Sequence, residues 1–270
     1  MTLPNHKETE NLSERQKKFA VTATVTAQNS PAPAVFRLTL AAPAIAAHAV
    51  PGQFVMVRLE NNSPVTLRRP LGLATADKST GQIELIYRVM GEGTAALSEL
   101  KAGEKINVLG SLGQGFAPPA ARTLLVGGGM GLSPLLCYAQ SFPAQTDILM
   151  GGKNAKEMFW SELFSPFVNK TYITTDDGSL GQRGFTVSML PELIRQNNYD
   201  LVLAVGPEVM MRKAAEICRE FNVKCQISLE RRMACGLGAC LSCSFTAVSG
   251  ARRRVCHDGP VFYAEEVYNV

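Results

Sequence analysis

The chain has 270 residues, of which 46% are hydrophobic and 19% charged, so a globally disordered chain is excluded and about two domains with a small appendage are expected. The net charge of +4 comes from scattered basic residues, which excludes the concentrated basic face of a nucleic-acid-binding protein. No apolar run approaches the roughly 20 residues of a membrane-spanning helix.

Residues 1–18 are polar and lack the apolar centre of a signal peptide, which predicts a flexible or loosely helical lead-in to a cytoplasmic protein. Short runs of β-type residues, separated by turn residues, then follow at residues 20–27, 35–40, 54–57, 83–89 and 106–109. A short helix is expected over residues 94–100. This spacing predicts a small antiparallel β-barrel over residues 19–117.

After residue 117 the pattern changes to strands that alternate with helices. Strands are expected at 123–126, 147–150, 171–174 and 201–205, with helices that begin at 133, 156 and 208. This alternation predicts a parallel α/β domain over residues 118–228. We therefore expect an α+β multidomain protein.

The most specific motif is C-x4-C-x2-C followed by a distant fourth cysteine, which is the spacing of a plant-type [2Fe–2S] loop. Its members are Cys235, Cys240, Cys243 and Cys256. Gly236 and Gly238 allow the loop to curl around a cluster. A structural zinc site and buried free thiols are the alternatives, although zinc sites favour two C-x2-C pairs and this chain has one. Residues 229–270 are too short to fold on apolar burial alone and predict a small cluster domain. The other cysteines, Cys137, Cys218 and Cys225, are expected to be buried thiols.

Two glycine-containing loops follow strands of the predicted parallel sheet. The first contains Gly127, Gly128, Gly129 and Gly131, and the second contains Gly206 and Pro207. Both loops should emerge at the carboxyl edge of the sheet, where open α/β folds bind ligands. Glycines there let a pyrophosphate approach the N-terminus of a helix, and a plain tight turn is the alternative for the first loop.

The barrel half contains two further candidate phosphate contacts. Arg69 lies beside Arg68 and Pro70, and an arginine held there can pair with a phosphate as a fork. Gly93 and Thr94 lie at the start of the short predicted helix, whose N–H groups can bind the same pyrophosphate. A solvated edge strand and a plain helix cap are the alternatives.

Together these motifs resemble the electron-transfer subunits of the type B dihydroorotate dehydrogenases, a family of the ferredoxin–NAD(P) reductase superfamily. The resemblance extends over nearly all of the chain from residue 19. Its most specific stretch is residues 228–243, supported by residues 51–54, Arg69-Pro70, residues 127–134, residues 176–179 and Gly206-Pro207.

The resemblance implies a flavin-binding barrel, an NAD-binding α/β domain and a C-terminal [2Fe–2S] domain, with NAD as co-substrate. It implies that FAD is held by Arg69, Pro70, Leu71, Gly72, Ile86, Tyr87, Arg88, Gly93 and Thr94, and that the four motif cysteines ligate the cluster. The implied partner is an FMN-containing catalytic subunit, in a heterotetramer with two copies of each subunit. Electrons would pass from its FMN through the cluster and FAD to NAD⁺, in pyrimidine biosynthesis.

The chain departs from the family pattern at two positions. Gly72 stands where superfamily members usually offer a Ser or Thr hydroxyl to the flavin, and Val205 stands where the family often has Cys. Preference for NAD over NADP is expected because Asp176 and Asp177 would repel a 2′-phosphate, although Lys153 favours the opposite choice.

Two other functions stay open: a related reductase subunit that serves ferredoxin, sulfite reductase or hydrogenase, and a zinc-stapled, non-enzymatic nucleotide-binding protein. With three histidines and no hydrolytic constellation, we assign no catalytic residue.

Overall fold

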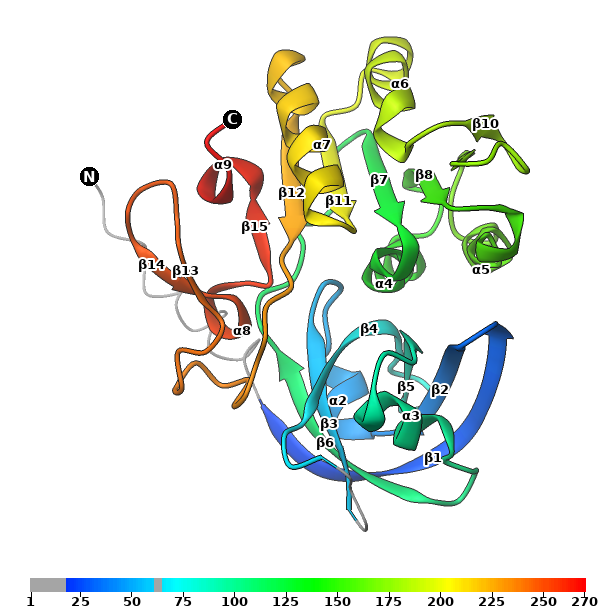
Figure 1. Ribbon diagram of the computed structural model, residues 1–270, viewed down its shortest axis with the longest axis vertical. Helices are drawn as coiled ribbons and strands as arrows, with labels where there is room; N and C mark the ends of the chain where they lie inside the picture. The colour runs from blue at the N-terminus through cyan, green and yellow to red at the C-terminus, as the bar shows by residue number, and fades with distance from the viewer. Residues whose placement is uncertain (1–17, 61–64) are drawn as a thin grey trace.

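The computed structural model describes residues 18–60 and 65–270 (Figure 1). The predicted lead-in therefore lies outside the described residues, except for Lys18. In Figure 1 the barrel lies at the bottom, the parallel sheet with its helices lies above it, and the C-terminal segment flanks both. In the described parts of the chain, no helix combines the length and the apolarity needed to cross a membrane.

Six strands close into a barrel in the order β1-β2-β5-β4-β3-β6, and each neighbouring pair is antiparallel. The strands are β1 (Phe19–Ala32), β2 (Val35–Ala41), β3 (Phe54–Leu59), β4 (Arg69–Asp77), β5 (Gln82–Arg88) and β6 (Lys105–Leu112). Alternate side chains such as Leu38, Leu40 and Ile106 fill the interior. The helices α2 (Pro43–His48) and α3 (Glu92–Ser98) complete this half. The predicted antiparallel barrel is confirmed.

Strand β4 is absent from the sequence prediction, although it carries several predicted flavin contacts. Its first four residues, Arg69 to Gly72, are only half-buried, whereas the next three are buried. A proline and a half-exposed face hide the period of two that identifies a strand. Only the closure of the barrel makes this segment a strand.

The upper half is a seven-stranded sheet in the order β10-β9-β8-β7-β11-β12-β15. Its strands are β7 (Thr123–Gly128), β8 (Thr146–Gly152), β9 (Thr171–Thr175), β10 (Gln182–Arg183), β11 (Leu201–Val205), β12 (Lys224–Ser228) and β15 (Val261–Tyr263). All pairs are parallel except β12 with β15. Central strands β7 and β11 are buried along their whole length, as parallel strands covered on both faces should be. The predicted α/β domain is confirmed.

The helices of this half are α4 (Leu132–Ser141), α5 (Trp160–Phe164), α6 (Leu190–Asn197) and α7 (Glu208–Glu220), with 3₁₀ turns η1 (Gly129–Gly131), η2 (Ala155–Glu157) and η3 (Thr186–Met189). The sequence prediction missed α6, β10 and β12. It also gave one helix over residues 156–164, where the structure has a 3₁₀ turn followed by the short α5.

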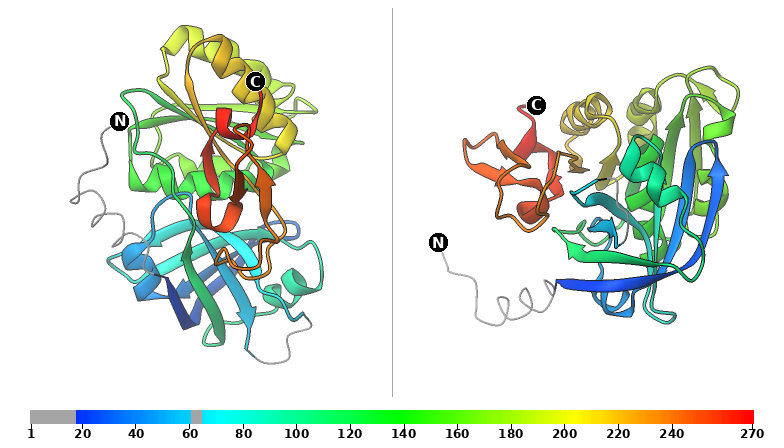
Figure 2. Two further views of the ribbon diagram at one scale, coloured as in Figure 1. Left: turned by 90° about the vertical axis from the view of Figure 1, so that its left-hand side faces the viewer. Right: turned by 60° about the horizontal axis from the view of Figure 1, so that its bottom comes forward.

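The C-terminal segment contains β13 (Ser244–Thr246), β14 (Arg252–Arg254), α8 (Val255–Asp258), β15 and α9 (Ala264–Val267). Its strand β15 extends the parallel sheet, and its Phe262 and Tyr268 share one buried cluster with Met211 of α7. Figure 2 shows the segment against the side of both other halves. The hydrophobic residues of the C-terminal segment are therefore buried largely by packing against the α/β half. The division at residues 228 and 229 stays a prediction.

Candidate cofactor-binding sites

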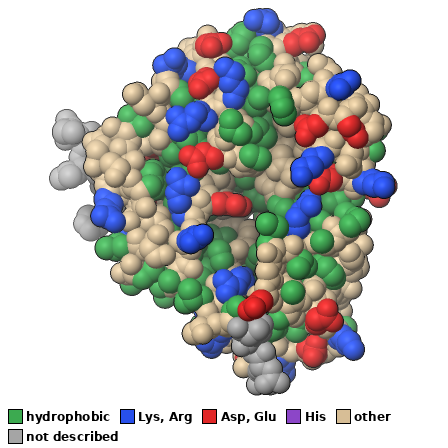
Figure 3. Space-filling view, in the orientation of Figure 1, with side chains coloured by type: hydrophobic (Ala, Val, Ile, Leu, Met, Phe, Trp, Pro, Cys, Tyr) green, Lys and Arg blue, Asp and Glu red, His purple; other side chains and the backbone are tan. Residues whose placement is uncertain are grey.

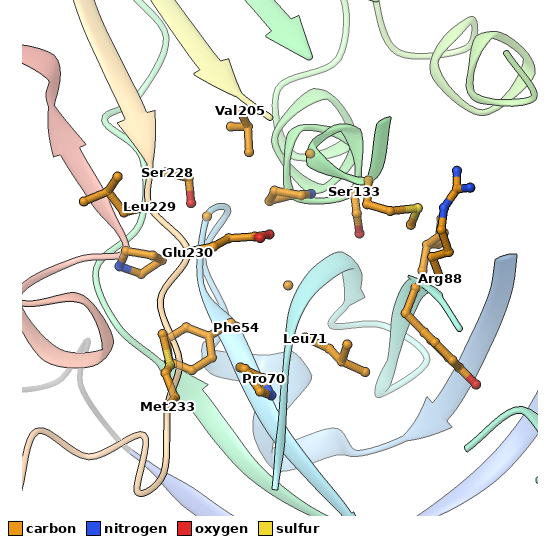
Figure 4. Close-up of a pocket in the computed structure, with 18 of the residues that line it drawn as sticks. Phe54, Pro70, Leu71, Arg88, Ser133, Val205, Ser228, Leu229, Glu230 and Met233 are labelled. Carbon is orange, nitrogen blue, oxygen red and sulfur yellow. The ribbon is translucent and has the colours of Figure 1, made fainter. Parts of the chain in front are cut away.

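A cavity of about 450 Å³ opens between the barrel and the parallel sheet (Figure 4). The predicted FAD-binding residues on its barrel wall are Pro70, Leu71, Gly72, Ile86, Tyr87, Arg88 and Thr94. The opposite wall consists of the turn after β7, the first turn of α4 and residues 228–231. Figure 3 shows the hollow between the two halves, with acidic and basic side chains around it. Its volume is in the range of a cofactor site.

Arg69 and Gly93, the other two predicted flavin contacts, lie together just outside this wall. A Cβ added to Gly93 would lie 2.5 Å from Nε of Arg69, so a larger residue at position 93 would displace the Arg69 side chain. Among the described residues, the Arg69 guanidinium makes no hydrogen bond or ion pair, whereas the Arg69 backbone is paired with Val57 of β3. Arg68, in contrast, donates to the carbonyl of Met56 at 3.3 Å and to Oδ1 of Asn107 at 2.5 Å.

Tyr87 and Arg88, in the barrel wall of the first cavity, are held in place by polar contacts with neighbouring elements. The Tyr87 hydroxyl donates to Oε1 of Gln28 at 3.3 Å, and the amide of Gln28 donates to the carbonyls of Leu97 and Ser98 at the end of α3. Burial raises the pKa of Tyr87, so this residue stays neutral at any physiological pH. Arg88 pairs with Glu157 of the α/β half at 3.2 Å. These contacts connect the barrel wall of the first cavity to Gln28 and the end of α3 on one side and to the α/β half on the other.

A second cavity, of about 430 Å³, lies at the carboxyl edge of the sheet. Both predicted glycine loops line it, through Gly128, Gly129, Gly131, Gly206 and Pro207. Gly127 lies behind the wall, where an added Cβ would overlap the side chain of Leu132. The loops meet because β7 and β11 are adjacent and parallel. Pro207 and Glu208, at the start of helix α7, also line this cavity, and the expected binding of a pyrophosphate at these loops stays a prediction.

The two cavities share one boundary, formed by Met130, Gly131 and residues 229–231. Among the residues that the structure describes, Arg231 is the only basic one that lines the second cavity, and it pairs with Glu208 at 3.3 Å. Met233 lies in the wall of the first cavity, two residues before Cys235. The sequence argument assigned no role to residues 230–233. The sequence signal that could have identified them is their position in the chain, because these residues connect the last parallel strand to the cysteine loop.

Lys153, Asp176 and Asp177, on which the expected choice between NAD and NADP rested, line neither cavity. The backbone N–H of Asp177 donates to the carbonyl of Lys153 at 3.3 Å, which joins the two loops. The Asp177 carboxylate accepts a hydrogen bond from the Ser179 N–H at 2.9 Å, and hydrogen bonds from Ser179 lower its pKa. The preference for NAD stays a prediction.

The cysteine loop is curled as a cluster-binding loop must be. Gly236 and Gly238 have φ values of +70° and +83°, in the region that favours glycine. Backbone N–H groups point at the sulfurs: that of Leu237 lies 3.3 Å from Sγ of Cys235, and that of Gly238 lies 3.2 Å from Sγ of Cys256. Such donors stabilise thiolate ligands. Cys137, Cys218 and Cys225 are buried free thiols, as expected.

The four motif cysteines approach one another in two pairs. Burial raises the pKa of Cys235, but backbone N–H groups of Leu237 and Cys240 and contact with the Cys240 side chain outweigh it, and the pKa is about 6. Cys256 contacts Cys243, and its pKa is raised to about 12 by burial and by that neighbour. Among the described residues, no three potential ligands gather closely enough to hold a single ion. The backbone N–H groups directed at Sγ of Cys235 and Cys256 fit an iron–sulfur cluster, whose ligand sulfurs accept such bonds.

The cysteine loop packs directly on the barrel. A Cβ added to Gly236 would lie 2.7 Å from Cγ of Met56 in β3. The backbone N–H of Gln114, just after the barrel, donates to the carbonyl of Gly259 at 2.6 Å, and its side chain donates to the carbonyl of His257. Met233 and Pro260, which precede and follow the four cysteines in the chain, line the first cavity, so the cysteine loop lies beside the first cavity, which in turn adjoins the second.

This arrangement defines a flavin- and iron–sulfur-binding oxidoreductase of the ferredoxin reductase fold. Residues 21–116 match the family described as "Oxidoreductase FAD-binding domain". Residues 230–268 match the family described as "Iron-sulfur cluster binding domain of dihydroorotate dehydrogenase B". The protein thus has an FAD-binding domain and an iron–sulfur cluster domain.

Relatives that match 80–90% of the chain narrow the class of protein. The chain is 38% identical over 253 residues to a Bacillus caldolyticus protein named "Dihydroorotate dehydrogenase B (NAD(+)), electron transfer subunit", covering 90% of this chain and 96% of that one. A Caldanaerobacter subterraneus protein of the same name is 39% identical, over 80% of this chain and 86% of its own length. The chain belongs to this family of electron transfer subunits.

Solved structures agree with this fold. The structure of an NADH-dependent reduced ferredoxin-NADP oxidoreductase is 29% identical, with a TM-score of 0.79 over 92% of this chain and 90% of that one. A ferredoxin NADP+ reductase from Neisseria gonorrhoeae with bound FAD and NADP is 13% identical, with a TM-score of 0.58 over 74% of this chain and 91% of its own. The second likeness shows the fold alone.

Proposed function

We propose that this chain carries electrons from the FMN of a dihydroorotate-oxidising catalytic subunit, through its own [2Fe–2S] cluster and FAD, to NAD⁺ in pyrimidine biosynthesis. The observation that carries the proposal is the adjacency of the cysteine loop, the first cavity and the second cavity, joined by residues 229–233. When bound, FAD exchanges two electrons with NAD and single electrons with an iron–sulfur cluster. A flavin must therefore lie between the other two sites, as this order of sites provides.

The residues of the chain serve this function by binding and placement. The predicted flavin contacts of β4 and β5 hold the ring of FAD, while Arg69 and the start of α3 hold its phosphates. The loops at Gly127–Gly131 and Gly206–Pro207 hold the dinucleotide, and the shared boundary brings its nicotinamide to the flavin. Cys235, Cys240, Cys243 and Cys256 ligate the cluster.

The catalytic subunit would meet the chain at the cysteine loop, in a heterotetramer with two copies of each subunit. Leu237 and Leu241, which flank Cys240 in this loop, have 42% and 50% of their surface exposed. All seven cysteines are free, which suits a cluster protein of the reducing cytoplasm.

A visible spectrum with iron and FAD analysis of the purified protein tests the cofactors. Flavin and iron–sulfur bands are expected, and a colourless sample would refute the proposal. Dihydroorotate-dependent formation of NADH, after mixing with an FMN-containing catalytic subunit, tests the partner. The likeness to the ferredoxin-NADP oxidoreductase makes a ferredoxin-linked reductase the second candidate. Reduction of ferredoxin by NADH, without any response to the catalytic subunit, would favour it.

A further inference from the structure

We propose that the hydroxyl of Ser133 hydrogen-bonds the flavin ring in the first cavity and so supplies the contact that Gly72 cannot make. The inference rests on the proposed function, because it requires FAD in this cavity. It assigns a cofactor contact to the α/β half, whereas the expected flavin contacts all come from the barrel.

Ser133 is a buried polar side chain without a partner. Its surface is 3% exposed, and among the described residues its Oγ has no hydrogen-bond partner. Nearly all buried polar groups in folded proteins are hydrogen-bonded, because an unpaired one lowers stability. Ser133 lines the first cavity, and in Figure 4 its side chain points from α4 into that space. A ligand in the cavity is the group that can satisfy it.

The position of Ser133 favours the flavin over the dinucleotide. Ser133 belongs to the wall of the first cavity and not to that of the second. The next residue, Pro134, would lie 3.7 Å from a Cβ on Gly72, so the start of α4 packs against the flavin-binding strand β4. The hydroxyl that β4 lacks at Gly72 is therefore available from the facing helix.

The chemistry of the ring makes the contact useful. A serine hydroxyl can donate to the nitrogen and oxygen acceptors at the polar edge of the isoalloxazine ring. Reduction makes N1 and the carbonyl oxygens of the ring more negative, whereas N5 gains a proton and no longer accepts, so we assign the Ser133 bond to N1 or a carbonyl oxygen, where it favours the reduced flavin. Ser133 would thus raise the midpoint potential of the bound FAD as well as its affinity.

Ser133→Ala is the test variant, with Thr146→Val as the matched control. Thr146 is also buried and its hydroxyl is also unpaired, but it lines neither cavity. Ser133→Ala should keep or raise the melting temperature of the FAD-free protein, because it removes an unpaired buried hydroxyl. It should weaken FAD binding about tenfold, the effect of one hydrogen bond. Its flavin absorption bands should shift without NAD present, and its midpoint potential should become more negative. Thr146→Val should leave all three flavin readouts unchanged.

Gly72→Ser in the Ser133→Ala background supplies a rescue. The nearest atoms to a Cβ at Gly72 belong to Pro134, at 3.7–4.0 Å, so a serine fits there without strain. The double variant should recover FAD affinity and potential towards the wild-type values.

The outcomes separate the two proposals. Wild-type protein that binds no FAD would overturn both. Equal FAD affinity, spectrum and potential in wild type and Ser133→Ala would overturn the role of Ser133 while the proposed function stands. A rise in KM for NADH alone would place the hydroxyl on the dinucleotide and overturn the flavin contact.

Discussion

We expect the two adjacent arginines of the barrel to have different roles: Arg69 binds FAD, and Arg68 stabilises the fold. Arg68 is engaged, since it donates to the carbonyl of Met56 at 3.3 Å and to the carbonyl and Oδ1 of Asn107 at 3.4 and 2.5 Å. The Arg69 guanidinium has no hydrogen-bond or ion-pair partner among the described residues, and its Nε lies where a Cβ of Gly93 would crowd it. The two side chains therefore offer a matched pair of substitutions.

We expect Arg69→Ala to weaken FAD binding by roughly 1.5–3 kcal/mol, the scale of one charge-assisted hydrogen bond. That loss corresponds to an increase of about 10- to 150-fold in the dissociation constant. The FAD-free protein should lose less than about 0.5 kcal/mol of stability, because among the described residues the Arg69 side chain makes no hydrogen bond or ion pair that would be lost. Arg68→Ala should reverse the pattern, with about 1–3 kcal/mol of stability lost and FAD affinity nearly unchanged.

Titration of the FAD-free variants with FAD, followed by flavin fluorescence, measures the affinity. Urea unfolding of the same FAD-free samples measures the stability. Wild-type affinity in Arg69→Ala, or an equal loss of affinity in Arg68→Ala, would refute the assignment. In the second case the phosphates would be held by Arg68, which would have to leave Asn107.

Three further outcomes are expected. Cys240→Ser should lose the cluster and keep most of its FAD, because its side chain is exposed and lines neither cavity; iron and flavin assays on one preparation check this, and proportional loss of both would contradict it. With an artificial acceptor, kcat/KM should be higher for NADH than for NADPH. Arg231→Ala should raise the KM for NADH about tenfold at unchanged flavin content, because no other basic side chain among the described residues lines the second cavity. An equal or higher kcat/KM for NADPH, or an unchanged KM, would speak against these expectations. Asp258→Asn should cost about 1–3 kcal/mol in urea unfolding, since the carboxylate accepts hydrogen bonds from the backbone N–H and Nε of Arg254 at 2.7 and 3.2 Å; wild-type stability would show that the pair contributes nothing.

Local patterns in the sequence were sufficient for most of the regular elements and for the cluster motif. The helix expected to begin at residue 208 is α7 (Glu208–Glu220), and the spacing of Cys235, Cys240 and Cys243 identified the cluster loop. Such signals are local because helix periodicity, glycine conformations and ligand spacing depend on residues close together in the chain. The resemblance of these motifs then sufficed to identify the family.

The cavities were decided by the tertiary structure alone. The first cavity joins β4, β5, the start of α4 and residues 228–233, which lie far apart in the chain. From the sequence alone, Ser133 is an ordinary residue at the start of a helix, and only the packing of the barrel against α4 buries its hydroxyl. From the sequence alone, β15 belongs to a separate domain, and only its pairing with β12 places it in the parallel sheet. The periodicity of hydrophobic residues in a segment indicates which side of that helix or strand is buried, but it does not indicate which other element covers that side. Only packing specifies that neighbour, and here packing makes Ser133, Arg231 and Met233 walls of the cofactor cavities.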